Sequence, residues 1–301
     1  TAYFLKLRRG EFNEAAVTVP NYLSGLSVKQ IIPSLTAQSG QPWTTLEPFT
    51  VILYPYVEGQ NGFERALSDQ QWVEFGVALK KFHTADMPSV ITSSIPKEKF
   101  SPRWRETVRL FLTRIEEETF VEPVAMQMAA FLRIKHNETL ALIHRAERFA
   151  RMLMAQPPAF IVCHADIHAW NLLLADKGAV YIVDWDTLIF APKERDLMFV
   201  GGGLGGYGHS PQEEEALFYA GYGQTQIDQV AMAYYRYERI IEDIAVYCEQ
   251  IFLSADGGED RQQALEYLKS NYAPNGTIAM AIQSATMLQA DPHGRQDDPT
   301  H

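Results

Sequence analysis

The residues best suited to chemistry are gathered in Cys163–Asn171, which reads CHADIHAWN. His164, Asp166 and His168 occupy alternate positions directly after an apolar run, so on an extended strand they would share one face. Three such side chains could hold a transition metal, although no further Cys or His nearby completes the usual ligand set of a zinc site. A metal hydrolase built on these three residues is one alternative, and a polar turn is another.

A second pattern extends over a longer range. Asp166 and Asn171 are five residues apart, and Asp184 follows thirteen residues later at the end of the β-rich run 180–184. A hairpin-like arrangement brings a carboxylate that can accept a proton together with an amide and a carboxylate that can hold a hard cation such as Mg²⁺. Phosphoryl transfer needs both, because the attacking hydroxyl must be oriented and the charge on the phosphates neutralised.

These residues also carry a resemblance. His164-x-Asp166-x-x-x-x-Asn171, followed by Ile182-Val183-Asp184, resembles the catalytic and metal-binding segments of the aminoglycoside phosphotransferase family, relatives of protein kinases. The segments LSDQQWVEFGVALKKFH and PKERDLMFVGGG are similar to that family too, and the similarity spans most of residues 1–290. The resemblance implies a two-lobed, protein-kinase-like α+β fold and a Mg²⁺-dependent enzyme that transfers a phosphoryl group from ATP or another nucleoside triphosphate.

The resemblance implies a role for single residues. Asp166 is implied as the catalytic aspartate, and Asn171 and Asp184 as the ligands of Mg²⁺. Lys6, on the first strand, would contact the α- and β-phosphates and pair with Glu14 on the following helix, in the arrangement by which kinases position a nucleotide.

Other implied roles concern the adenine and the loop itself. Backbone groups between Tyr54 and Val57, with Tyr56 between them, would receive the adenine. His164 would brace the catalytic loop by hydrogen bonding.

Two departures from the protein-kinase pattern bear on the substrate. Protein kinases have Arg where this chain has Ala165, and Gly where it has Asp186. A protein substrate is therefore disfavoured. Asp186 either adds an acidic group near the metal ions or caps the next turn, and the sequence does not decide between these.

The expected substrate is a small cationic molecule. A net charge of −11 attracts cations, and Glu238, Glu242 and Asp243 could bind substrate amines, unless Arg236 and Arg239 neutralise them. The resemblance favours an aminoglycoside or aminocyclitol antibiotic such as spectinomycin, and hence antibiotic resistance. A kinase of a metabolite hydroxyl, of the choline, homoserine or sugar type, is an alternative, and so is a non-catalytic nucleotide-binding protein.

Composition narrows the class further. The chain has 301 residues, 47% of them hydrophobic, so it can bury a large core. Its negative charge argues against a nucleic-acid partner, because phosphate backbones require a basic face. No apolar run approaches the roughly 20 residues of a membrane-spanning helix, and two cysteines indicate a reducing compartment. We therefore expect a cytoplasmic protein without a membrane partner; its oligomeric state is left open.

The positioning elements fall into a small β-rich part and a large helical part. Strands are expected at residues 2–7, 30–35 and 50–54, and a short helix at 11–23. Further strands are expected before Lys6, since a chain rarely begins in the middle of a sheet. The expected division is a partial N-terminal nucleotide-binding lobe (1–56), a helical C-terminal lobe with the catalytic loop and substrate cleft (57–289) and a disordered tail (290–301).

Helix signals dominate the second part. Ser68 and Gln71 form a capping box ahead of apolar residues at helical spacing. Helices are also expected after Ser101 and Ser210, each followed by proline, and over residues 122–154. The run 201–206 contains a literal G-x-G-x-x-G, but no βαβ unit surrounds it, so it predicts a loop rather than a dinucleotide site.

Overall fold

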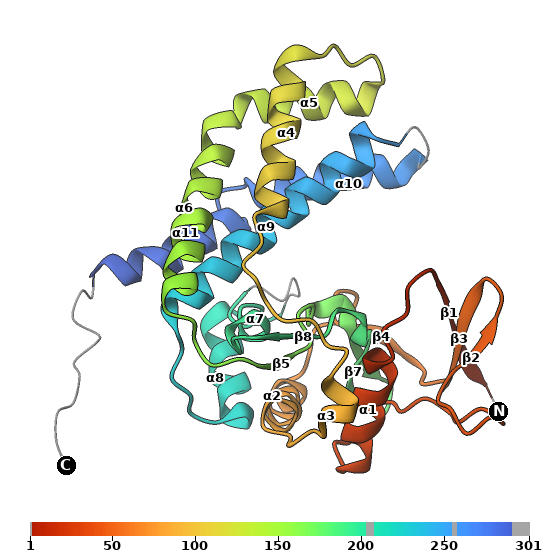
Figure 1. Cartoon of the computed structure of the whole chain (residues 1–301). Helices are drawn as coiled ribbons and strands as arrows, with labels where there is room; N and C mark the ends of the chain where they lie inside the picture. The colour runs from red at the N-terminus through yellow and green to blue at the C-terminus, as the bar shows by residue number, and fades with distance from the viewer. Residues whose placement is uncertain (1, 203–207, 255–257, 291–301) are drawn as a thin grey trace. The chain divides into compact units, whose positions relative to one another are not determined.

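The computed structural model describes residues 2–202, 208–254 and 258–290 (Figure 1). The chain forms two compact units. The first contains Thr1–Glu98 and Ala159–Gln226, and the second contains Lys99–Pro158 and Ile227–His301. Residues 203–207 of the glycine-rich run and the expected tail from residue 291 onward lie outside the described residues. The α+β fold class expected from the sequence is confirmed.

Three small sheets form the β structure of the first unit. In the first sheet, strand β1 (Tyr3–Arg9) pairs with β3 (Phe49–Pro55), which pairs with β2 (Thr44–Leu46), all antiparallel. The second sheet joins β4 (Gly59–Asn61), β6 (Leu172–Ala175) and β7 (Val180–Ile182), and the third joins β5 (Ile161–Cys163) and β8 (Ile189–Ala191). The β6–β7 pair is the hairpin expected from the sequence, with the short helix η1 (Ala169–Asn171) before it and η2 (Trp185–Thr187) after it.

The helices of the first unit pack beside these sheets. They are α1 (Ala15–Gly25), α2 (Asp69–His83), α3 (Ser89–Thr92), α7 (Glu194–Leu197) and α8 (Pro211–Tyr222). Helix α2 lies against α8 (Figure 1). Their backbones approach so closely that a Cβ on Gly76 or Gly221 would overlap backbone atoms of the other helix. Glycine at both positions therefore sets the depth of this helix crossing.

The second unit consists of helices. They are α4 (Arg103–Glu117), α5 (Pro123–Ile134), α6 (His136–Ala155), α9 (Gln229–Phe252), α10 (Gly258–Asn271) and α11 (Thr277–Ala290). Helix α9 packs against α4, α6, α10 and α11, and its apolar face is buried along its length. Within this unit α9 is thus the central helix.

Most expected elements are present, and one is reduced. The capping boxes at Ser68 and Ser210 are formed, so both helices begin where the sequence indicates. The helical region expected over 122–154 consists of two helices that meet at Lys135. The strand expected over 30–35 is reduced to one bridge, between Ile31 and Ile182, because Pro33 has no N–H to continue a ladder.

The compact units do not coincide with the lobes expected from the sequence. The first unit takes in residues on both sides of position 56, because α1 packs against η2 and Ile31 bridges to Ile182 of β7. The lobe boundaries 1–56 and 57–289 stay a prediction. No helix in the described part of the chain is long and apolar enough to cross a membrane.

Candidate active site

The expected catalytic loop, residues 164–171, begins where β5 ends, and a buried carboxylate stabilises its first turn. Asp196, on α7, accepts hydrogen bonds from the backbone N–H groups of His164 at 2.9 Å and of Ala165 at 2.6 Å. Ala165 has a φ of 70°, in the left-handed region, which costs a residue with a side chain about 1–2 kcal/mol. The two bonds stabilise this turn, and the turn presents Asp166 as a partly exposed carboxylate.

The catalytic loop is tied to the segment that carries Asp184. His164 Nε2 donates to the carbonyl oxygen of Val183 at 3.0 Å, and Thr187 Oγ1 donates to the carbonyl oxygen of His164 at 2.7 Å. The Val183 amide donates to the carbonyl oxygen of Asn171 at 3.0 Å. Burial lowers the pKa of His164, so its imidazole is neutral at pH 7. His164 thus lies where the sequence predicts a brace, joining the loop to the residue before Asp184.

Asp166 and Asn171 are five residues apart in the loop, and a hydrogen bond joins them. The Asn171 side chain is buried, and its Nδ2 donates to the carbonyl oxygen of Asp166 at 2.7 Å. This bond leaves the amide oxygen of Asn171 as its ligand atom. His168 Nε2 lies 3.3 Å from Asp166 Oδ2, so His168 is a neighbour of the expected catalytic carboxylate.

The metal-cage alternative finds no support in the described part of the chain. There, the group whose ligand atoms lie close enough for a metal ion is His83, Cys163 and Asp196, not the three residues of the catalytic loop. All three are buried, and Asp196 already accepts two backbone hydrogen bonds and one from His83. Burial raises the pKa of the Cys163 thiol, so the thiolate that a metal requires is disfavoured. This group is therefore a hydrogen-bonded part of the core.

Asp184 and Asp186 form a charge cluster with two basic residues of β1. Lys6 Nζ lies 2.8 Å from Asp184 Oδ1 and 2.7 Å from Asp186 Oδ2. The Arg8 guanidinium contacts Asp186 and lies 3.7 Å from Asp184 Oδ1. Burial lowers the pKa of Lys6, while the hydrogen bond to Asp184 raises it and limits the fall. Of the two predicted roles for Asp186, the acidic group beside the expected metal ligand is the one this geometry favours.

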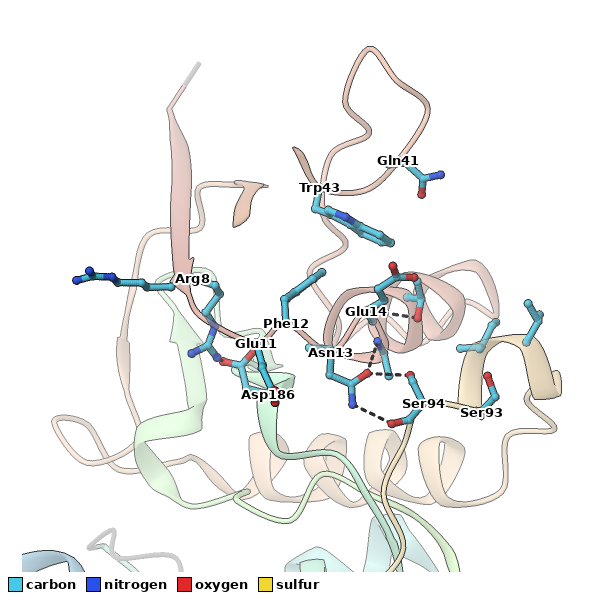
Figure 2. Close-up of a pocket in the computed structure, with 16 residues that line it drawn as sticks. Arg8, Glu11, Phe12, Asn13, Glu14, Gln41, Trp43, Ser93, Ser94 and Asp186 are labelled. Carbon is cyan, nitrogen blue, oxygen red and sulfur yellow. Dashed lines mark hydrogen bonds and ion pairs between the residues drawn. The ribbon is translucent and has the colours of Figure 1, made fainter. Parts of the chain in front are cut away.

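The expected Lys6–Glu14 pair is not formed. Lys6 pairs with the two aspartates, because β1 brings its ammonium group directly to them, whereas Glu14 stands at the start of α1. Glu14 lines a cavity of about 900 Å³ together with Phe12, Trp43 and Asp186 (Figure 2). The Lys6–Glu14 contact stays a prediction.

The segment expected to receive adenine lies at the end of β3. Burial, followed by the nearby charge of Asp184, raises the pKa of Tyr54 to about 12, so Tyr54 lies close to the charge cluster. Tyr56 is exposed, and its amide donates to Ala2 at 3.4 Å. Val57 follows beyond the β1–β3 ladder and makes no backbone hydrogen bond among the described residues. Its amide and carbonyl are suited to a ligand.

The three acidic residues proposed for substrate binding lie on α9, in the second unit. Glu238 is buried and pairs with Arg105 of α4 at 3.4 Å, which favours the structural role. Asp243 pairs with Arg239 at 3.0 Å, as the structural alternative predicts. Glu242 is half-buried. Substrate roles for Glu238, Glu242 and Asp243 stay predictions.

Sequence reasoning missed two residues that support the site. Asp196 holds the catalytic loop, and Arg8 shares the aspartate cluster with Lys6. A signal existed for Asp196, because PKERDLMFVGGG was already matched to the family, although no role was attached to its aspartate. No signal in the sequence distinguished Arg8 from any other basic residue of the strand.

The donor set fits Mg²⁺. Asn171 offers an amide oxygen, and Asp184 and Asp186 offer carboxylates, which are the oxygen ligands that this hard cation prefers. Their segments are bonded to each other through Val183 and Asn171. Asp184 adopts a left-handed backbone with a φ of 60°, and its side chain is about half exposed at 51%. The Asp184 carboxylate is therefore accessible to a ligand that enters from solvent.

Comparisons with known proteins show which family the chain is similar to. The family model described as the phosphotransferase enzyme family matches residues 11–237. A crystal structure of spectinomycin phosphotransferase in complex with ADP and spectinomycin is 33% identical, with a TM-score of 0.87, and the match covers 94% of this chain and 86% of that one. An AMP-bound complex of spectinomycin phosphotransferase is 34% identical, with a TM-score of 0.84 and coverage of 93% and 87%.

A more distant structure shares the fold alone. The aminoglycoside phosphotransferase from Alicyclobacillus acidocaldarius is 14% identical, with a TM-score of 0.57, and the match covers 95% of this chain and 85% of that one. The family match spans well over half of the chain and includes Asp166, Asn171, Asp184 and Asp186. The chain therefore belongs to the phosphotransferase enzyme family and is a small-molecule phosphotransferase.

Proposed function

We propose that this protein transfers the γ-phosphoryl group of ATP, with Mg²⁺, to a hydroxyl group of an aminocyclitol antibiotic such as spectinomycin. One observation carries the proposal most directly. The Val183 carbonyl oxygen accepts a hydrogen bond from the His164 side chain, and the Val183 amide donates to the Asn171 carbonyl oxygen. These two bonds hold the segment that carries Asp166 beside the segment that carries Asp184, as phosphoryl transfer requires. The biological consequence would be resistance to the antibiotic.

The residues divide the work between orientation and charge. Asp166 accepts a hydrogen bond, and then the proton, from the attacking hydroxyl of the acceptor. Asn171 and Asp184, with Asp186 beside them, would hold Mg²⁺, which supplies neutralisation of the β- and γ-phosphate charge when bound. Lys6 adds positive charge on the phosphate side of the same cluster. Positioning of the reacting groups provides most of the rate enhancement.

The adenine is proposed to lie against the segment Tyr54–Val57. The free amide and carbonyl of Val57, beyond the β1–β3 ladder, support this assignment. Neighbouring structures with bound ADP and AMP support a nucleotide as co-substrate. ATP is the working proposal among nucleoside triphosphates, because the neighbouring structures contain the adenine nucleotides ADP and AMP.

Two features support an aminocyclitol as acceptor. The chain is 33% identical to a spectinomycin phosphotransferase over nearly its whole length. Its net charge of −11 favours association with cations. A choline/ethanolamine kinase family protein from Mesorhizobium loti shares the fold at 14% identity, which supports no substrate.

The two buried free cysteines are consistent with the proposed cytoplasmic location, where thiols stay reduced.

Mass spectrometry tests the proposal. The protein is incubated with ATP and Mg²⁺ and, separately, with spectinomycin, kanamycin, streptomycin and choline, and Asp166→Ala serves as the control. We expect a gain of one phosphoryl group on spectinomycin with the wild-type protein alone. Phosphorylation of choline in its place would favour the metabolite alternative. Absence of product with every compound, despite nucleotide binding, would favour the non-catalytic alternative.

A further inference from the structure

A chain of buried hydrogen bonds leads from helix α8 to the catalytic loop. Tyr222, the last residue of α8, places its hydroxyl 2.9 Å from Nδ1 of His83, the last residue of α2. His83 Nε2 lies 2.9 Å from Asp196 Oδ2, and Asp196 holds the amides of His164 and Ala165. Every member of the chain is buried, and Asp196 is fully so.

The direction of these bonds follows from the donors available. Asp196 Oδ2 accepts the His164 amide, and its ionised form has no proton to donate, so His83 Nε2 must carry a proton that points at it. In the neutral imidazole, His83 Nδ1 is then an acceptor, and the Tyr222 hydroxyl is the donor placed to satisfy it. The carboxylate requires the Nε2–H tautomer, and the hydroxyl satisfies the acceptor that this tautomer leaves at Nδ1.

The packing of the two helices sets this contact. A Cβ on Gly221 would lie 1.9 Å from the carbonyl oxygen of Val73, and a Cβ on Gly76 would lie 2.2 Å from the carbonyl oxygen of Phe218. The two glycines let α2 and α8 approach at a depth that brings Tyr222 to His83. The contact is therefore built into the helix crossing rather than being an accident of a surface side chain.

We propose that the Tyr222 hydroxyl is a positioning group for phosphoryl transfer. It holds the His83 ring through Nδ1, so that the Nε2–H group stays aimed at Asp196, and Asp196 keeps the left-handed turn at Ala165 that presents Asp166. Without the hydroxyl, the buried Nδ1 acceptor loses its donor, and the ring is held through Nε2 alone. The ring would then be free to turn, its bond to Asp196 would weaken, and the turn at Ala165 would loosen. The expected effect on kcat rests on the proposed function, whereas the expected effect on the His83–Asp196 hydrogen bond does not.

The kinetic test uses two matched substitutions. Tyr222→Phe removes the hydroxyl and one buried hydrogen bond. Tyr272→Phe also removes a buried hydroxyl, which bonds to Thr139 at 2.7 Å in the second unit. We expect Tyr222→Phe to lower kcat about tenfold, the effect typical of residues that orient a catalytic group through another, with KM for ATP and for spectinomycin unchanged. Tyr272→Phe should leave kcat within about twofold.

A spectroscopic measurement separates this proposal from the proposed function. Nitrogen-15 NMR of histidine-labelled protein reports which ring nitrogen of His83 carries the proton. We expect protonated Nε2 in all three proteins. In Tyr222→Phe alone, the resonance of Nδ1 should shift to the position of an imidazole nitrogen that accepts no hydrogen bond. Unprotonated Nε2 in the wild type, unchanged His83 signals in Tyr222→Phe, or equal losses of kcat in the two variants would overturn the proposal. If the wild type phosphorylates no compound, the proposed function fails, and the NMR result alone decides whether Tyr222 holds His83 against Asp196.

Discussion

At the scale of single residues, the site is a set of carboxylates with different surroundings. Asp196 is fully buried and accepts three hydrogen bonds, whereas Asp166 is partly exposed beside His168. Asp184 faces the two basic residues of β1. The same side-chain type therefore serves as a structural acceptor, as the proposed base and as the proposed metal ligand, and the surroundings decide which.

Replacement of the proposed base gives the first prediction. Asp166→Ala should reduce turnover by at least about 10²–10⁴-fold, because the attacking hydroxyl loses its proton acceptor. ATP affinity should change little, since Asp166 makes no proposed contact with the nucleotide. Steady-state kinetics and calorimetry of ATP binding check both parts. Near-normal turnover in the variant would remove Asp166 from the mechanism.

Asp184 gives a second prediction, with the opposite signature. Asp184→Ala should abolish the increase in ATP affinity that Mg²⁺ produces, because a carboxylate ligand is lost. Calorimetry with Mg²⁺ and with EDTA, on the wild type and on the variant, measures the difference. Glu47→Ala, an exposed glutamate in the β2–β3 turn, is the control and should keep the metal effect. An undiminished metal effect in Asp184→Ala would contradict the assignment.

The titration of Asp196 gives a prediction about acid stability. Burial raises its pKa, but the hydrogen bonds from His83 and from the Ala165 amide help to outweigh burial, and the pKa lies below its usual value of 3.8. Its contribution to stability is therefore present above pH 3.8 and is lost as the pH falls through the lower, folded-state value. The difference in unfolding free energy between wild type and Asp196→Asn should be constant from pH 7 to about 5 and shrink in stronger acid. Urea denaturation at a series of pH values measures it.

At the scale of elements, the first unit depends on close helix packing and on bonded loops. Helices α2 and α8 meet through glycines, and the loops after β5 and β7 are bonded to each other. Neither arrangement involves the exposed faces of the helices. The site is consequently sensitive to changes in backbone spacing that leave every candidate catalytic side chain in place.

Gly221→Ala tests this sensitivity. The added methyl group would lie 1.9 Å from the carbonyl oxygen of Val73, so α8 must shift away from α2. We expect a loss of about 1–3 kcal/mol of stability, the usual result of overpacking, observed as a lower Tm. Gly25→Ala, at a position where a Cβ meets nothing within 4 Å, is the control and should leave Tm nearly unchanged. Equal Tm values for the two variants would contradict the close crossing.

At the scale of the whole molecule, both cysteines are buried free thiols. Cys163 lies in the first unit and Cys248 in the second, and burial raises the pKa of each thiol. Because the thiolate is the reactive form, neither should react with a thiol reagent while the protein is folded. Titration with a chromogenic disulfide should detect no thiol in buffer and two in denaturant. Rapid reaction of one thiol in buffer would show that its unit opens readily.

The sequence by itself determined the chemistry. The residue types and spacing of Asp166, Asn171 and Asp184 define a phosphoryl-transfer pattern, and the capping boxes and helical periodicity placed the main helices, because these signals are local. The α+β class and the family followed from the same residues. The hairpin between Asn171 and Asp184 was also predictable, since β6 and β7 are adjacent in the chain.

Only the tertiary structure decided which side chains contact each other across long stretches of sequence. The pairing of Lys6 with Asp184 and Asp186 spans nearly 180 residues, and the chain from Tyr222 through His83 to Asp196 joins three separate helices. No local pattern encodes such contacts, because they depend on which surfaces the folded chain brings together. For the same reason the burial of Glu238 against Arg105 could not be predicted from the helix that carries it.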